Sequence, residues 1–299
     1  MFQVMKRTLF SALLFTFSQS SAQTVYTGSI GNYPVEMVIY AAAKTADALY
    51  SYTDYDEPIP LHNGTINNGK LTFYEKEGTG KQQTRAILTL DYFSEGQNTL
   101  SGIWKNRKTK SELKINLTKK YAIENGENIQ WSNRELLQPV SAGNQYFKVV
   151  VSKEKDQYYP MATSVKIFEK RTDKLLQKLD INCQLLGLNN ISIGDYNFDG
   201  IDDFSVFESS YAGPNTSSIY FLYDRKTHQY YESSFSGISL EFDPVKRRVY
   251  ERNQCCAGTV VTTVEYKVVK DNLIPLTQHC FRWNEEKQKL VEKPMKECR

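Results

Sequence analysis

Residues 28–40 read GSIGNYPVEMVIY, a glycine-containing turn followed by a short apolar run. Short runs of alternating apolar and polar residues, separated by turn residues, continue from Val25 to Leu117. Alternation with a period of two indicates β-strands. The turns divide this stretch into about eight antiparallel strands, enough to close a small meander barrel. We therefore expect an N-terminal β module at residues 23–118 with a small, antiparallel, barrel-like fold.

The rest of the chain also favours strands. Residues 119–144 lose the alternation and gather Asn, Gly, Glu and Pro, so we interpret them as a linker with one short helix near residues 133–137. Strand patterns resume at Tyr146, without long helical periodicity. The sequence thus predicts an all-β protein whose second domain, at residues 145–299, is propeller-like or sandwich-like and carries one calcium loop.

Three successive segments of the first module carry a Gly-x-Ile-Gly opening and a Leu-Ser-Gly-x-Trp strand: residues 28–40, PIPLHNGTINNGKLTFYE at 58–75, and TLSGIWKNRKTKSELKINL at 99–117. Over residues 26–118 the chain resembles a small β module found in exported bacterial proteins of unknown function. This resemblance implies that Gly31 and Gly102 meet backbone requirements and that Trp104 anchors the core. It names a fold without naming an activity.

The first 22 residues have the pattern of a secretory signal peptide. Lys6 and Arg7 precede an apolar stretch from Leu9 to Phe17, and small residues lie at Ser20 and Ala22. The apolar stretch is far shorter than the roughly 20 residues that span a bilayer. We expect cleavage after residue 22 and a periplasmic or secreted mature chain without an integral membrane segment.

The charge balance argues against nucleic acid as a partner. Without Lys6 and Arg7, the 37 basic residues become 35 against 34 acidic ones, a net charge of +1. Binding to a phosphate backbone needs an excess of basic residues on one surface.

All five cysteines lie in the second half of the chain. In an exported protein, disulfides are expected. Many pairings are open to sequence reasoning, and we favour Cys280 with Cys298, and Cys183 with either Cys255 or Cys256. Direct pairing of Cys255 with Cys256 is disfavoured, because the ring strains the intervening peptide.

The segment DYNFDGIDD, residues 195–203, has the spacing of a calcium loop. Oxygen-bearing side chains lie at relative positions 1, 3, 5 and 9, and glycine lies at position 6. The predicted ligands are the side chains of Asp195, Asn197, Asp199 and Asp203 and the carbonyl of Ile201. Strand-like flanks and a valine at position 12 exclude a full EF-hand. The alternative is an Asx-rich turn without metal. We expect calcium in a structural role.

Residues 193–224, IGDYNFDGIDDFSVFESSYAGPNTSSIYFLYD, combine this loop with a following strand, a turn and a second strand. This pattern resembles the calcium-binding immunity proteins of antibacterial type IV secretion systems, which are similar in fold to periplasmic inhibitors of invertebrate-type lysozyme. Such a protein blocks a peptidoglycan hydrolase or another secreted toxin. The resemblance covers residues 145–285 and implies a target-binding loop containing Ser209, Ser210, Tyr211, Gly213 and Asn215.

No catalytic constellation is apparent from the sequence, so we expect no enzyme. The three histidines lie in no metalloprotease or hydrolase motif. Two alternatives to the inhibitor stay open. One is a calcium-stabilised module that binds glycan or protein without inhibition, and the other is a cell-wall hydrolase with Glu208 as its acid.

Overall fold

The computed structural model describes residues 23–78, 83–211 and 213–298. The predicted signal peptide at 1–22 lies outside these residues. Within them the chain is all-β, apart from two short turns of 3-10 helix, η1 (Cys256–Gly258) and η2 (Met295–Glu297). None of the described residues forms a helix long and apolar enough to cross a membrane.

The first eight strands form a closed barrel in simple meander order, so the prediction of an eight-stranded barrel is confirmed. β1 closes the barrel on β8, with Gly28 opposite Leu117. The strands are β1 (Gln23–Ile30), β2 (Tyr33–Ala42), β3 (Thr45–Tyr52), β4 (Ile59–Asn67), β5 (Lys70–Lys76), β6 (Thr84–Asp91), β7 (Thr99–Asn106) and β8 (Glu112–Ile123).

The barrel interior is filled by alternate residues of all eight strands. Trp104 lies in this core, as expected, and Gly31 makes its turn with a φ of 63°. A Cβ on Gly102 would lie 2.0 Å from the carbonyl oxygen of Thr89, so close strand approach requires glycine there.

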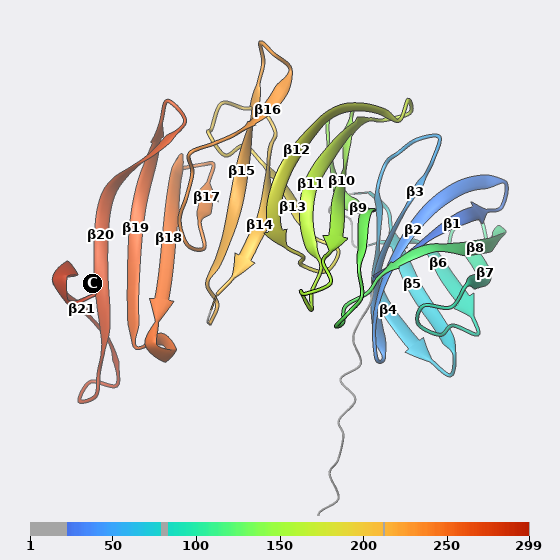
Figure 1. The fold of residues 1–299 in the computed structure, drawn as a ribbon, viewed down its shortest axis with the longest axis horizontal. Helices are drawn as coiled ribbons and strands as arrows, with labels where there is room; N and C mark the ends of the chain where they lie inside the picture. Colours follow the sequence, from blue (N-terminus) through green and yellow to red (C-terminus); the bar gives the residue numbers. More distant parts are fainter. Residues whose placement is uncertain (1–22, 79–82, 212, 299) are drawn as a thin grey trace, which may run out of the picture.

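Three antiparallel meander sheets follow the barrel in a row that ends at the C-terminus (Figure 1). The first contains β9 (Trp131–Ala142), β10 (Gln145–Lys153), β11 (Met161–Glu169) and β12 (Lys174–Gln184). The second contains β13 (Ile191–Gly194), β14 (Asp203–Ser210), β15 (Thr216–Asp224) and β16 (Gln229–Glu232). The third contains β17 (Glu241–Asp243), β18 (Arg248–Cys255), β19 (Val260–Val269), β20 (Asn272–Asn284) and β21 (Lys289–Lys293).

The stretch predicted as a linker is mostly strand. Residues 119–123 end β8, and residues 131–142 form β9, where the sequence had suggested a short helix. Leu136 and Leu137 are both buried in β9. Consecutive apolar residues fit a strand buried on both faces as well as a helix, which is why the local pattern misleads.

One hydrophobic core joins the barrel to the first two sheets. It runs from Val25, Val38 and Leu49 on the outer side of the barrel to Phe147 in β10 and Phe204 in β14. An ion pair between Glu36 and Lys148, 3.3 Å between Oε1 and Nζ, crosses the same junction. A second, aromatic cluster around Tyr220 and Phe242 joins the second sheet to the third.

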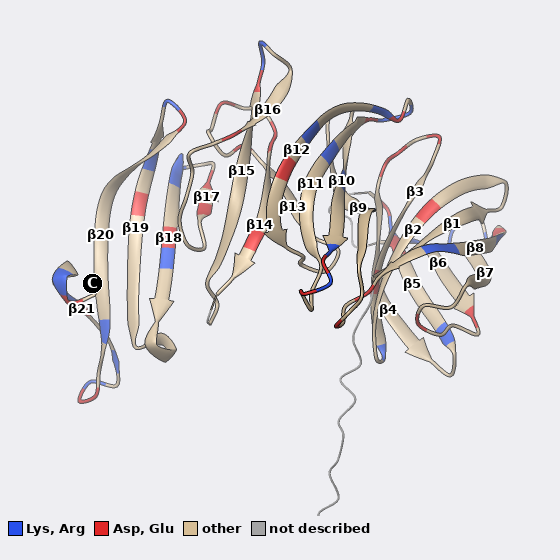
Figure 2. Ribbon diagram, viewed as in Figure 1, with Lys and Arg blue, Asp and Glu red and all other residues tan. Residues whose placement is uncertain are grey.

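Lys, Arg, Asp and Glu are distributed over the barrel and the sheets, and neither sign is confined to one of them (Figure 2).

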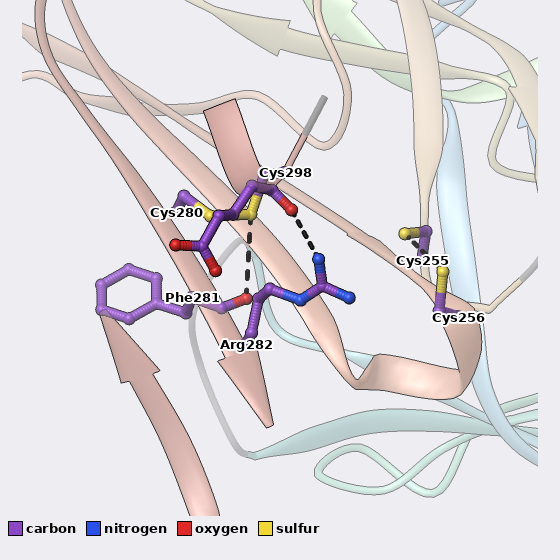
Figure 3. Close-up of a disulfide and its surroundings, with 7 residues drawn as sticks. Cys255, Cys256, Cys280, Phe281, Arg282 and Cys298 are labelled. Atoms are coloured by element: carbon purple, nitrogen blue, oxygen red, sulfur yellow. Dashed lines mark hydrogen bonds between the residues drawn. A yellow bond between two sulfur atoms is a disulfide. The ribbon is translucent and has the colours of Figure 1, made fainter. Parts of the chain in front are cut away.

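The cysteines adopt one of the two predicted pairings. Cys280 and Cys298 form a disulfide that attaches the C-terminal turn to β20 (Figure 3). The predicted bond from Cys183 to Cys255 or Cys256 is wrong. Cys183 lies in β12 of the first sheet and is fully buried, whereas Cys255 and Cys256 are exposed at the end of β18 in the third sheet.

Candidate functional site

A pocket of about 440 Å³ lies where the barrel meets the first sheet. Clefts of this size are typical of small-molecule sites. Its wall comes from β1, β2 and the end of β8 on the barrel side, and from the start of β11 and the segment after β12 on the sheet side. The lining residues are Gln23, Tyr40, Ile123, Asn125, Tyr159, Pro160, Met161, Gln184, Leu185 and Gly187.

Gln23 holds the two sides of the pocket together. Its Nε2 donates a hydrogen bond of 2.9 Å to the carbonyl oxygen of Gly187, in a loop that turns there with a φ of 47°. The residue is only 5 % exposed, yet its Oε1 has no hydrogen-bond partner among the described residues. Buried polar atoms are nearly always paired, so this oxygen, which has almost no accessible surface, lacks a donor that such an atom usually has.

The lining carries no Asp, Glu, Lys, Arg or His. It combines two tyrosine rings with three carboxamides, from Gln23, Asn125 and Gln184. Tyr159 is 65 % exposed and contacts the ring of Tyr158 edge to face, with centroids 4.8 Å apart. An uncharged wall of aromatic faces and amides suits a neutral ligand that has apolar faces and hydroxyl or amide groups.

A second hollow, of about 400 Å³, lies between the second and third sheets beside Asp195, Tyr196 and Tyr220. Its central hydroxyl is already paired, because Tyr196 Oη lies 2.9 Å from Ser205 Oγ. It therefore lacks the unpaired buried acceptor of the first pocket.

The predicted target-binding loop is the hairpin between β14 and β15. Ser209 and Ser210 end β14, Tyr211 is 49 % exposed, and Gly213 turns the chain with a φ of 77°. Ala212 of this loop lies outside the described residues. The amide of Ser210 donates to Oε1 of Gln184 at 3.0 Å, so the base of the hairpin is bonded to a residue of the pocket wall.

Asn215, also predicted to bind the target, is buried and makes three hydrogen bonds across to β18. Its Nδ2 donates to Asn253 Oδ1 at 3.0 Å and to the carbonyl of Gln254 at 2.8 Å, and its Oδ1 accepts the Gln254 amide at 3.1 Å. This side chain joins the second sheet to the third.

In the predicted calcium loop, side-chain oxygens accept hydrogen bonds from backbone amides. Asp195 accepts from Asp199 at 2.9 Å and from Gly200 at 2.8 Å. Asn197 Oδ1 accepts the Asp199 amide at 3.1 Å, and Asp199 Oδ1 accepts the Ile201 amide at 2.9 Å.

Asp203 is 1 % exposed and binds backbone on both sides of the loop. Its Oδ2 accepts from Tyr196 and its Oδ1 from Tyr223, each at 2.9 Å. Burial raises the pKa of its carboxyl group to about 6, although these backbone hydrogen bonds act to lower it.

Among the described residues, no group of three or more His, Cys, Asp or Glu side chains is arranged to hold a metal ion.

Sequence reasoning did not find the pocket. Gln23 begins β1, more than a hundred positions before Tyr159 and Gln184, and Gln184 ends β12. None of the three stands in a recognisable motif. The one local signal is the run Tyr158-Tyr159-Pro160, where two aromatic residues precede a proline. Such a run is common in surface turns and does not identify a site.

No family model matches the chain, and no curated protein matches it. Among solved structures it is similar to a putative 6-phosphogluconolactonase from Bacteroides uniformis, with a TM-score of 0.28 and 10% identity over 91% of this chain and 82% of that one. It is also similar to a protein from Lactobacillus plantarum, with a TM-score of 0.25 and 9% identity over 91% of this chain and 95% of that one.

These comparisons overturn the resemblances inferred from the sequence. Neither the exported module of residues 26–118 nor the immunity proteins and lysozyme inhibitors compared with residues 145–285 are recovered. The chain is thus an all-β protein with an eight-stranded barrel, and both proposed family assignments are wrong.

Proposed function

We propose that this protein is an exported, non-enzymatic binding protein whose pocket between the barrel and the first sheet takes a neutral saccharide carrying N-acetyl groups. The observation that carries the proposal is the buried, unpaired Oε1 of Gln23 in an uncharged pocket wall. A sugar hydroxyl or an acetamido N–H that reached this oxygen would supply the donor that it lacks.

The other lining residues suit the same ligand. The C–H face of a pyranose ring packs on an exposed tyrosine ring such as that of Tyr159, while its hydroxyl groups bond to the carboxamides of Asn125 and Gln184. Charged sugars are disfavoured, because no basic side chain lines the pocket to offset a carboxylate. Hydrolysis of a glycosidic bond usually needs two carboxyl groups flanking it, and the lining contains none.

Isothermal titration calorimetry with three trisaccharides tests the proposal: an N-acetylglucosamine trimer, a glucose trimer and a galacturonic acid trimer. We expect binding of the first, weaker binding of the second and none of the third. Tyr159→Ala should abolish the heat of binding, whereas Tyr92→Ala, on an exposed tyrosine of the barrel, should leave it unchanged. No binding of any trimer, or equal loss in both variants, would refute the proposal.

We also propose that the Asp195 loop binds calcium as a structural ion. The support is the spacing of Asp195, Asn197, Asp199 and Asp203 and the carbonyl of Ile201. We propose periplasmic or secreted localisation from the pattern of residues 1–22. We propose a propeller-like arrangement of the successive meander sheets from their order.

Inhibition of a peptidoglycan hydrolase is a second candidate, favoured by the hairpin after β14. Tyr211 is half-exposed, with its hydroxyl 3.2 Å from Ser217 Oγ, in a hairpin whose two ends are held by Gln184 and Asn215, so little ordering entropy is lost on insertion into a cleft. The test is clearing of peptidoglycan suspensions by a panel of muramidases, with and without the protein. Protection that disappears in Tyr211→Ala would support it, and clearing unaffected by the protein would count against it.

A further inference from the structure

The two adjacent cysteines at the end of β18 hold their sulfur atoms 3.0 Å apart. Cys255 is the last residue of the strand and Cys256 opens η1, and both side chains are exposed (Figure 3). The separation is shorter than ordinary contact between unbonded sulfur atoms and longer than a disulfide bond of about 2.05 Å.

The backbone explains how neighbouring side chains meet. In a continuing strand, successive side chains point to opposite faces of the sheet. Here Cys255 is still extended, with φ −129° and ψ −178°, and the chain enters the left-handed region at Cys256, with a φ of 55°. Ala257 and Gly258 keep positive φ values of 53° and 82°. This turn brings the second sulfur round to the first.

No other thiol of the described residues competes for this pair. Cys280 and Cys298 are bonded to each other. Cys183 is fully buried in another sheet, and burial raises the pKa of its thiol to about 12, which leaves it unreactive. On the third sheet, Cys255 lies opposite Val260 and Val260 lies opposite Arg282, so the guanidinium shares a face with the thiol pair. The hydrogen bond with Cys256 raises the pKa of the Cys255 thiol, and the charge of Arg282 acts to lower it.

We propose that Cys255 and Cys256 form a reversible dithiol–disulfide site that exchanges with small-molecule disulfides of the glutathione type. One thiolate attacks a sulfur of the external disulfide and releases one thiolate as leaving group. The second cysteine then attacks the resulting mixed disulfide and releases the other. The two protons of the dithiol pass to the leaving groups, so one external disulfide is reduced to two thiols while the two cysteines are oxidised to an eight-membered ring.

Exposure and ring strain distinguish this site from the other disulfide. Strained or exposed disulfides have higher reduction potentials than protected ones. The ring should therefore be reduced by dithiothreitol at lower concentration than the bond between Cys280 and Cys298.

The full chain without residues 1–22, mildly reduced, is mixed with oxidised glutathione, alkylated and digested for mass spectrometry. We expect a peptide in which Cys255 and Cys256 have lost their thiol hydrogens by forming a disulfide with each other, and in which neither carries glutathione. Cys255→Ser and Cys256→Ser should each retain one glutathione on the remaining cysteine, and Cys183→Ser should behave as wild type. The circular dichroism spectrum of each variant checks that it folds. Glutathione retained on both cysteines of the wild type, no reaction at either, or a link to Cys183 would each overturn the proposal.

Discussion

The side-chain amide of Gln23 bonds to the carbonyl oxygen of Gly187 at 2.9 Å, across 164 positions of sequence. This contact joins the first strand of the barrel to the loop that follows the first sheet. The oxygen of the same carboxamide is buried and has no hydrogen-bond partner among the described residues. One side chain therefore closes the junction and supplies the acceptor on which the proposed ligand recognition rests.

Gln23→Leu should weaken saccharide binding about tenfold or more, because a net hydrogen bond to a buried acceptor contributes about 1 to 2 kcal/mol. Its effect on unfolding should be small, since the loss of the Gly187 contact is offset by removal of an unpaired polar atom. Titration calorimetry and urea unfolding measure the two effects. Gln157→Leu, on an exposed glutamine outside the pocket, is the matched control. Equal affinity in both variants would remove Gln23 from the binding site.

Calcium should raise the thermal stability of the protein if the Asp195 loop binds it. At a hundredfold excess over the dissociation constant, a ligand specific for the folded state adds about 2.7 kcal/mol. We expect the melting temperature to be higher in calcium than in chelator, and Asp195→Asn to remove the difference. Asp202→Asn, on an exposed neighbour predicted to face away, should keep it. Identical melting curves in calcium and chelator would leave the loop as an Asx-rich turn.

Substitutions at two residues of the hairpin after β14 should differ in their effect on stability. Asn215→Ala removes three hydrogen bonds to β18 and leaves the Gln254 amide unpaired, which should cost about 2 to 3 kcal/mol of unfolding free energy. Tyr211→Ala, at a half-exposed position, should change stability by less than about 0.5 kcal/mol. Urea unfolding compares the two, and hydrogen exchange at residues 253–255 should rise only in the first. Equal stability of both variants would contradict the bridging role of Asn215.

High pH should unfold the protein through its buried tyrosines. Burial raises the pKa of Tyr26 and of Tyr121 to about 12. In the unfolded chain these groups ionise near 10. The unfolded state thus loses protons first, and the stability contributed by the neutral hydroxyls falls as pH rises from about 10 to 12. Urea titrations at pH 8, 10 and 11 should give decreasing unfolding free energies. A flat profile would mean that these side chains are hydrated in the folded state.

The barrel was predictable from the sequence because each strand alternates and each pairs with its neighbour in the chain. Local turns set that order, and the closing contact of β1 with β8 follows from the strand number. The pocket was not predictable, since Gln23 and Gly187 meet only through the packing of the barrel against the first sheet. The approach of Cys255 and Cys256 depends on the positive φ of Cys256, which no sequence pattern predicts.

The loop at Asp195 illustrates a different limit. Its spacing describes both a calcium site and a turn closed by its own amides, because the same inward-facing oxygens serve either purpose. In the structure these oxygens accept the amides of Asp199, Gly200 and Ile201. Whether calcium also binds there stays a prediction, and the spacing alone does not decide it.

A buried carboxylate in the barrel wall supplies the strongest stability prediction. Oε2 of Glu75 accepts the hydroxyl of Tyr50 and the indole N–H of Trp104, each at 2.8 Å, while Oε1 lies 3.5 Å from the guanidinium of Arg85. Glu75→Leu leaves both donors unpaired in the core and should cost about 3 to 5 kcal/mol. Glu75→Gln keeps an acceptor for at least one donor and should cost clearly less.

Thermal and urea unfolding of the two variants decide whether this network stabilises the barrel. Arg85→Met is the matched test of the ion pair, and it should cost less than Glu75→Leu because the carboxylate keeps its hydrogen bonds from Tyr50 and Trp104 and loses only a 3.5 Å contact with a largely exposed side chain. If Glu75→Leu proved as stable as the wild type, the hydrophobic gain at this position would equal the loss of both hydrogen bonds. The carboxylate would then have to be explained by something other than stability. If Glu75→Leu is the least stable of the three, the two aromatic donors and their acceptor form one structural unit that holds β3, β5 and β7 in register.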